Sequence, residues 1–253
     1  MEITTTTIHE GRLFEGSLSD KSGGVSFVRQ RTAVGSTIYC VGGDPRMSFY
    51  RPSASLFSLD TRHPDQSWKR RTSMRNIRSL PATVAFDGKI FVFDELEGDD
   101  DTDPKQWAEV FDTKSGQWGF LPPPPELPSF YGLFAVPIPF LNKVLVGSRD
   151  EGFLYTYEVK EGRWERWENS IIAPVPYHLQ PVAVGTGLFW FYEGTLHVYD
   201  SAGQWSHSSP IKDLDKVVPP AILTWRFDGL LHPVLLHVAG NVFCLLCLEI
   251  SAC

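Results

Sequence analysis

A short pattern recurs along the 253-residue chain and limits the folds open to it. Each clear copy has a strand-forming run, a turn that contains glycine, and a tryptophan two residues after that glycine. Three clear copies and an earlier, looser one are Val110–Trp118, Tyr157–Trp164, Val198–Trp205 and Ser58–Trp68. Their tryptophans stand at positions 68, 118, 164 and 205, which are 50, 46 and 41 residues apart.

A repeat of this length, built from short strands, predicts an all-β propeller with four strands per blade. Long amphipathic stretches of helical period are absent, whereas β-branched and aromatic runs recur between Gly, Asn and Asp residues. The clearest predicted strands are Ser36–Val41, Lys89–Phe93, Lys143–Val146, Leu188–Tyr192 and Asn241–Leu246. We expect each repeated tryptophan to lie on an outer strand and to fill the wedge between neighbouring twisted sheets.

Two segments carry a resemblance to a known repeat. Gly35–Gly43 with Trp68 after it, and Phe86–Phe93 with Trp118 after it, each resemble a kelch repeat. The chain is most similar to plant kelch-repeat proteins, including the F-box/kelch group, and the resemblance covers nearly its whole length. The double glycine of the family survives only at Gly42-Gly43. Only about thirty residues precede the first repeat, so we expect no F-box helical segment there.

The second strand of each unit gives a count of the blades. Five such anchors are present and predict five blades, with six as the alternative because kelch propellers often have six. The anchors are Ile38, Ile90, Val144, Leu188 and Val242. The chain ends before the last unit is complete, so we expect N-terminal strands near Ile8–Leu13 to complete the last blade. The repeat runs from end to end and predicts a single domain over residues 1–253.

Composition excludes several classes of protein. The 30 acidic and 23 basic residues give a net charge of −7, which argues against nucleic-acid binding. No apolar run approaches the roughly 20 residues that span a bilayer, and the N-terminus lacks the pattern of a secretory signal. Four cysteines do not make a disulfide framework. We therefore expect a monomer in the cytoplasm or nucleus that does not bind membranes.

The resemblance also indicates where a partner would bind. In kelch folds, the loops after each second strand and before each first strand surround one mouth of the central channel. Aromatic and Arg side chains in such loops suit recognition of a partner. The predicted partner-binding residues are Arg78, Tyr131, Arg149, Trp225 and Arg226. The leading interpretation is a binding module that presents this mouth to a protein or to a small metabolite.

An enzyme of plant specialised metabolism is the alternative. Acid/base groups could come from Glu95, Glu193, His178 and Tyr177 in the same mouth loops. Arg149 could then hold an anionic substrate through two hydrogen bonds. A third hypothesis is a stand-alone relative of the F-box group that competes for substrates. Nothing in the spacing decides among the three.

The sequence predicts no metal site and no cofactor. Cys244 and Cys247 lie in one apolar predicted strand, where period-two alternation sends their sulfurs to opposite faces. The acidic tract Glu95–Asp103 lacks the spacing of a calcium-binding EF-hand loop. It also has Asp103 where nitrile-specifier proteins, another kelch group, would have a histidine. His197 lies inside a predicted strand, so we expect it to be a packing residue.

Overall fold

The structure is a computed structural model, and it describes the chain in thirteen stretches. They are residues 2–6, 30–42, 53–63, 65–78, 81–94, 107–126, 133–148, 154–167, 181–192, 194–200, 205–211, 234–239 and 242–246. Within these stretches the chain forms β-strands and one short 3-10 turn, η2 (Pro139–Leu141), and no α-helix. The described part of the chain also contains no helix long and apolar enough to cross a membrane.

The chain divides into two compact units, which are described separately below. One unit is residues 12–166, and the other combines residues 1–11 with residues 167–253. Whether the two form the single domain predicted from the sequence stays a prediction.

Within residues 12–166, the described strands form three four-stranded antiparallel sheets, each built from four strands that follow one another in sequence. The first sheet has β2 (Gln30–Val34), β3 (Thr37–Val41), β4 (Leu56–Asp60) and β5 (Lys69–Arg70). The second has β6 (Ala82–Phe86), β7 (Lys89–Phe93), β8 (Ala108–Asp112) and β9 (Gln117–Phe120). The third has β10 (Leu133–Ile138), β11 (Lys143–Ser148), β12 (Leu154–Glu158) and β13 (Arg163–Arg166).

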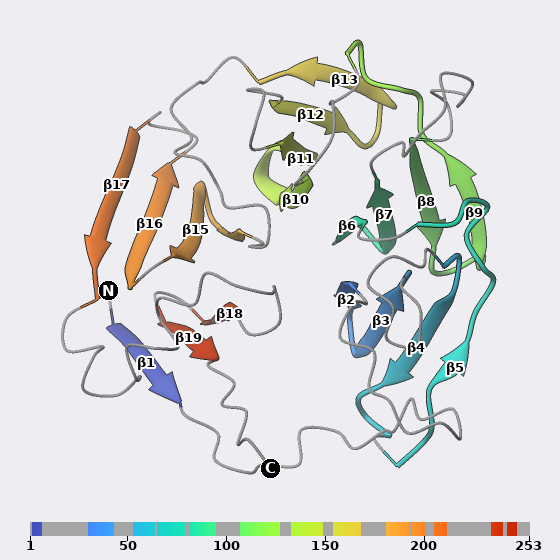
Figure 1. The fold of residues 1–253 in the computed structure, drawn as a ribbon, viewed down its shortest axis with the longest axis horizontal. Helices are drawn as coiled ribbons and strands as arrows, with labels where there is room; N and C mark the ends of the chain where they lie inside the picture. Colours follow the sequence, from blue (N-terminus) through green and yellow to red (C-terminus); the bar gives the residue numbers. More distant parts are fainter. Residues whose placement is uncertain are drawn as a thin grey trace. The chain divides into compact units, whose positions relative to one another are not determined.

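Consecutive sheets of this unit pack face to face. Figure 1 shows β2, β6 and β10 near one another, and contacts join β2 to β6 and β6 to β10. We call the space between the first two sheets the first junction and the space between the next two the second junction. Aliphatic and aromatic side chains pack in both, with Tyr39, Val41 and Phe111 in the first and Phe91, Val146 and Tyr157 in the second. Burial of these faces is the main stabilising contribution of the unit.

Local sequence determines the hairpins that build the sheets. Asp87 and Gly88 join β6 to β7 with φ angles of 49° and 71°. Two successive positive φ angles define a type I′ turn, whose twist matches that of the flanking strands, and the Asp-Gly pair favours it. The β10–β11 hairpin uses η2 instead and ends at Asn142, which is in the left-handed conformation.

The described residues of the other unit form two sheets. One is a four-stranded antiparallel meander of β14 (Val182–Val184), β15 (Gly187–Tyr192), β16 (Thr195–Asp200) and β17 (Trp205–Pro210). The other has the strand order β1 (Glu2–Thr6), β19 (Val242–Leu246) and β18 (Val234–Ala239).

The N-terminal strand joins the last sheet, as the sequence predicts. β1 pairs with β19 in parallel, with Glu2 opposite Val242 and Thr6 opposite Leu246. The segment Ile8–Leu13, on which the prediction was based, lies outside the described residues. The described strands form five sheets, and whether they amount to five blades or six stays a prediction.

The predicted second strands are confirmed as β3, β7, β11, β15 and β19, with ends that differ by two residues at most. His197 is confirmed as a packing residue within β16. Its ring stacks on Trp190 with centroids 5.4 Å apart, and its Nδ1 lies 2.7 Å from Ser208 Oγ. Burial lowers the pKa of His197, so the ring stays neutral near pH 7.

Candidate functional site

Of the nine predicted site residues, the structure describes one, Arg78. The other partner-binding candidates, Tyr131, Arg149, Trp225 and Arg226, lie outside the described residues. The same is true of the four acid/base candidates, Glu95, Glu193, His178 and Tyr177. Their roles therefore stay predictions.

Arg78 is buried against the second sheet. Its side chain is 3% exposed, and Nη2 lies 3.1 Å from Oε1 of Glu109, a β8 residue whose side chain is fully buried. Arg78 Nη1 donates a second hydrogen bond, of 3.0 Å, to the carbonyl oxygen of Trp107. A buried charge pair is tolerated when both partners are also hydrogen-bonded, as here. In this conformation the guanidinium stabilises packing against the second sheet. The predicted contact of Arg78 with a partner stays a prediction.

The segment that carries Arg78 is fixed on both sides. We call residues 71–78, between β5 and β6, the first connector. Glu109 accepts hydrogen bonds of 2.8 and 3.0 Å from the backbone N–H groups of Arg75 and Asn76. On the other side, Ser53 N donates to the Arg78 carbonyl at 2.7 Å, next to the start of β4. The first connector thus links the first sheet to the second.

The repeated tryptophans provide the same kind of link at both junctions. Trp118, which is 6% exposed, donates from Nε1 to the Thr72 carbonyl at 2.8 Å. Trp164 donates to the Pro122 carbonyl at 2.7 Å, in the second connector (residues 121–126). Each indole also contacts the aromatic residue opposite it in its own sheet, Phe111 or Tyr157, at a centroid distance of 5.0 Å. The predicted role of these tryptophans between sheets is confirmed at both positions.

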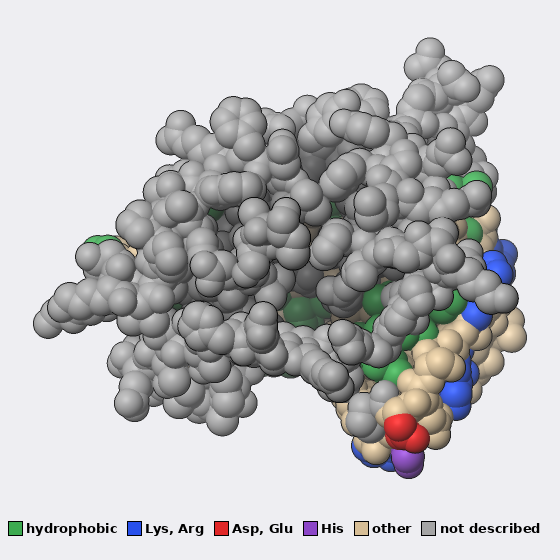
Figure 2. Space-filling model, turned by 60° about the horizontal axis from the view of Figure 1, so that its bottom comes forward, with side chains coloured by type: hydrophobic (Ala, Val, Ile, Leu, Met, Phe, Trp, Pro, Cys, Tyr) green, Lys and Arg blue, Asp and Glu red, His purple; other side chains and the backbone are tan. Residues whose placement is uncertain are grey.

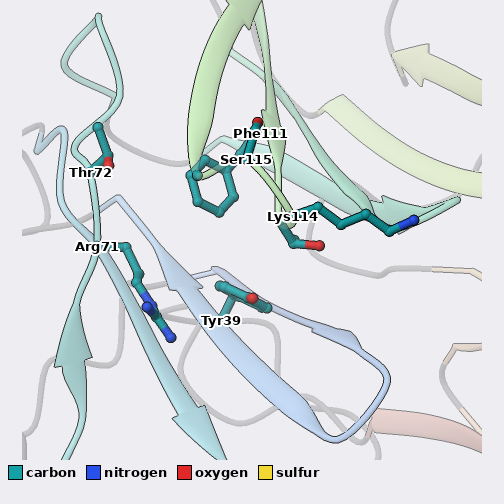
Figure 3. Close-up of a pocket in the computed structure, with 8 residues that line it drawn as sticks. Tyr39, Arg71, Thr72, Phe111, Lys114 and Ser115 are labelled. Atoms are coloured by element: carbon teal, nitrogen blue, oxygen red, sulfur yellow. The ribbon is translucent and has the colours of Figure 1, made fainter.

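A small hollow opens at the first junction, with a volume of about 220 Å³ (Figure 3). It is smaller than the roughly 300–1,000 Å³ of typical small-molecule sites, so it suits a small group rather than a whole metabolite. Its lining combines two cations with four hydroxyl side chains. The lining residues are Tyr39, Arg71, Thr72, Phe111, Thr113, Lys114, Ser115 and Gly116.

Arg71 and Tyr39 are the most favourably placed donors in this hollow. Arg71 Nε donates to Ser58 Oγ at 2.7 Å, and Ser58 is 2% exposed, so a buried hydroxyl orients the guanidinium. In Figure 3 the Arg71 side chain extends toward Tyr39, while the Lys114 ammonium points away from both. Burial raises the pKa of Tyr39, so its hydroxyl keeps its proton near pH 7.

Exposed cations continue beyond the hollow. Lys69 and Arg70 on β5, and Arg75 on the first connector, are exposed. Figure 2 shows Lys and Arg side chains spaced along one described edge of the molecule, although the chain as a whole is acidic. This local excess of positive charge favours anionic groups near the described edge.

No cluster of three or more His, Cys, Asp or Glu residues that could hold a metal ion occurs in the described part of the chain. The acidic tract from Glu95 to Asp103 lies outside it, as does Cys247.

Sequence reasoning missed the first-junction hollow. Its residues come from β3, from the first connector, and from β8 with the β8–β9 turn, which are far apart in the chain. Aligning the repeats on their tryptophans would have provided a signal. That alignment places Arg71 and Thr72 opposite Leu121 and Pro122, an unusual exchange of polar for apolar residues.

Comparisons with known proteins agree with these observations. A family model described as "FKB95, Kelch-repeats domain" matches residues 16–229. A putative F-box/kelch-repeat protein of Arabidopsis thaliana is 29% identical over 214 residues, covering 83% of this chain and 53% of the relative. Another F-box/kelch-repeat protein of that plant is 30% identical over 183 residues, covering 67% of this chain and 43% of the relative. The chain thus spans about half the length of these relatives.

A solved structure titled "Structure of YjhT" also resembles the chain. The TM-score is 0.55 at 12% identity, and the match covers 76% of this chain and 67% of that one. At this identity the likeness concerns the fold alone. Together with the four-stranded antiparallel sheets, the matches confirm the predicted kelch-type propeller fold. The plant relatives confirm the predicted resemblance to plant kelch-repeat proteins.

Proposed function

Because the chain belongs to the FKB95 kelch-repeat family, we propose that it is a protein-binding module that presents its inter-strand loops to a partner protein. The observation that carries this proposal is the repeated link between sheets. Trp118 and Trp164 tie successive sheets to their connectors in the same way, with hydrogen bonds of 2.8 and 2.7 Å. Such a scaffold holds its sheets in place while the loops between strands vary, which is how loop-based recognition surfaces are built.

The distribution of polar residues also supports binding as the function. Arg78 and Glu109, the buried ion pair of the first junction, are hydrogen-bonded to each other and to neighbouring backbone. A scaffold that satisfies its buried charges internally leaves recognition to its exposed loops. The relatives pair a kelch-repeat region with an F-box in their names, and we propose that the kelch region is the partner-binding part. The acid/base alternative rests on residues outside the described part of the chain and stays a prediction.

The proposal is tested by substituting the predicted mouth residues. Partners are captured from plant extract with the wild-type chain, identified, purified and measured for binding one by one. The variant Tyr131→Ala/Arg149→Ala/Trp225→Ala should weaken binding of a true partner at least tenfold, since Tyr, Trp and Arg dominate interface energetics. The control, Lys160→Ala/Arg163→Ala, changes two exposed cations on the third sheet and should bind as the wild type does. Equal binding by the mouth variant and the wild type would reject the proposal.

A further inference from the structure

The two junctions of residues 12–166 share one backbone arrangement. At the first, Gly116 N donates to the Asp112 carbonyl at 2.8 Å, and at the second, Gly162 N donates to the Glu158 carbonyl at 2.9 Å. The two glycines have φ angles of 70° and 68°. The connectors also correspond, because Thr72 and Pro122 each accept the tryptophan hydrogen bond described above. Equivalent positions can therefore be compared residue by residue.

Packing between the sheets corresponds as well. At the first junction, Tyr39 on β3 contacts Phe111 on β8 with centroids 6.3 Å apart. At the second, Phe91 on β7 contacts Tyr157 on β12 at 6.2 Å. The same frame is thus built twice, so any difference in side-chain chemistry between the two junctions is not required by the frame.

The side chains differ in one consistent direction. Three polar residues of the first junction have apolar equivalents at the second: Tyr39 becomes Phe91, Arg71 becomes Leu121 and Ser58 becomes Val110. Phe91, Leu121 and Val110 belong to the apolar cluster that fills the second junction. Apolar side chains are therefore sufficient for packing at these positions.

The connector and the turn change in the same way. Thr72 corresponds to Pro122, Thr113 to Val159 and Ser115 to Glu161. None of the described residues that line the first-junction hollow is a carboxylate, whereas the equivalent turn of the second junction carries Glu161. The exchange thus replaces hydroxyl groups and a cation with apolar and acidic groups.

Several hydrogen-bond donors line the hollow of the first junction. Ser58 accepts from Arg71 Nε, and no described residue forms a hydrogen bond with the two Nη groups, a geometry that suits a two-point contact with an oxyanion. The protonated Tyr39 hydroxyl is a further donor, and Thr72 lines the same space. Thr113 already donates to the Gly88 carbonyl at 2.6 Å, and Ser115 donates to Asp112. Asp112 itself accepts from the backbone N–H groups of Lys114 and Ser115, which stabilise its ionised form.

We propose that the first-junction hollow binds a phosphate monoester, carried on a phosphorylated side chain of the partner protein. The volume of about 220 Å³ accepts a group of that size and is too small for a typical metabolite. A phosphate offers three acceptor oxygens and nearly two negative charges at pH 7, which match the guanidinium, the hydroxyls and the nearby cations. The peptide-borne source of the phosphate rests on the proposed function, whereas the anion site itself does not.

The test measures binding of small probes to the purified full chain by isothermal titration calorimetry. The probes are N-acetyl-phosphoserine amide, inorganic phosphate and N-acetyl-serine amide. We expect saturable binding of the phosphoserine probe and none of the serine probe. Arg71→Leu and Tyr39→Phe introduce the residues that the second junction carries at the same places. We expect Arg71→Leu to abolish binding and Tyr39→Phe to weaken it about tenfold, as a lost hydrogen bond to a charged group does.

Controls separate loss of binding from loss of fold. Arg71→Lys keeps the charge without the two-point contact and should bind at an intermediate level. Lys160→Gln, at the equivalent turn of the second junction, should bind as the wild type does. Retained binding by Arg71→Leu would overturn the site. So would a wild type that is not saturated by 20 mM phosphoserine probe, which corresponds to roughly the weakest affinity of interest. Equal affinity for inorganic phosphate would support the anion site and overturn its peptide-borne source. If the probe experiments overturn this site and a partner is still captured through the mouth loops, the proposed function stands.

Discussion

At both junctions of residues 12–166 a strand contacts a connector, but the carboxylate is on the strand at the first junction and on the connector at the second. At the first, the carboxylate is on the strand, where Glu109 of β8 binds the connector through Arg78, Arg75 and Asn76. At the second, the equivalent strand position is Tyr155, whose hydroxyl donates at 3.2 Å to Glu126 on the connector. The comparison teaches that the frame requires a strand-to-connector contact but not a buried charge.

The largest difference that we expect concerns this strand-to-connector contact. Its loss should lower the free energy of unfolding more at the first junction than at the second. Glu109→Ala leaves the Arg78 guanidinium buried without its carboxylate, and we expect a loss of about 3–5 kcal/mol in the free energy of unfolding. Tyr155→Phe removes one hydrogen bond to an exposed carboxylate, and we expect about 1 kcal/mol or less. Urea denaturation followed by circular dichroism measures both.

A double variant sharpens this prediction. Glu109→Leu with Arg78→Met removes both charges and should recover much of the stability lost in Glu109→Ala, since apolar replacement of a whole buried pair is often nearly neutral. Equal losses in Glu109→Ala and Tyr155→Phe would show that the buried pair is no more demanding than the hydroxyl contact.

The tryptophans should behave alike at the two junctions. Trp118→Phe and Trp164→Phe each keep an aromatic ring and remove the hydrogen bond to the connector. We expect each to lower the free energy of unfolding by about 1–2 kcal/mol. Chemical denaturation of the two variants side by side checks the equivalence. A silent Trp164→Phe beside a destabilising Trp118→Phe would mean that only the first junction depends on this link.

The turn glycines should also give matched, smaller effects. Gly116→Ala and Gly162→Ala place a side chain in the left-handed region, and we expect each to cost about 1 kcal/mol. A Cβ at Gly116 would meet nothing within 4 Å, whereas one at Gly162 would lie 3.6 Å from Tyr157 Oη, an ordinary contact. Thermal unfolding measures both, and Gly116→Asn, which tolerates this conformation better, should cost less than Gly116→Ala. A larger loss for Asn would contradict the backbone explanation.

Local patterns predicted most of the fold. The strand β7 (Lys89–Phe93) matches its prediction residue for residue, because its composition and its Asp-Gly turn are local signals. The Gly-x-Trp pattern likewise predicted where Trp118 and Trp164 lie. A repeat in sequence implies a repeat in contacts, so the role of one copy predicts that of the next.

Contacts between distant residues could not be predicted in this way. Arg78 was predicted to bind a partner, and that role stays a prediction. The sequence did not predict its buried hydrogen bond to Glu109, a residue 31 positions away. Whether an Arg in a connector faces solvent or a carboxylate depends on the tertiary fold, which composition does not reveal. The first-junction hollow was missed for the same reason, since Tyr39, Arg71 and Thr113 line one space only when two sheets pack.

The smallest expected effect concerns the pH dependence of stability that comes from Asp112 at the β8–β9 turn. The hydrogen bond from the Ser115 backbone N–H, with that from Lys114, lowers the pKa of Asp112 below its ordinary value of 3.8. A lowered pKa in the folded state stabilises the fold in full above pH 3.8, and this contribution is lost as pH falls through the folded pKa. The stability of the wild type relative to Asp112→Asn should therefore be greatest near pH 6 and shrink below pH 3.8. Urea midpoints of both proteins across this range measure the change, and carbon NMR titration of the carboxyl measures its pKa directly. A titration midpoint at or above 3.8 would show that the turn does not hold the carboxylate as its geometry indicates.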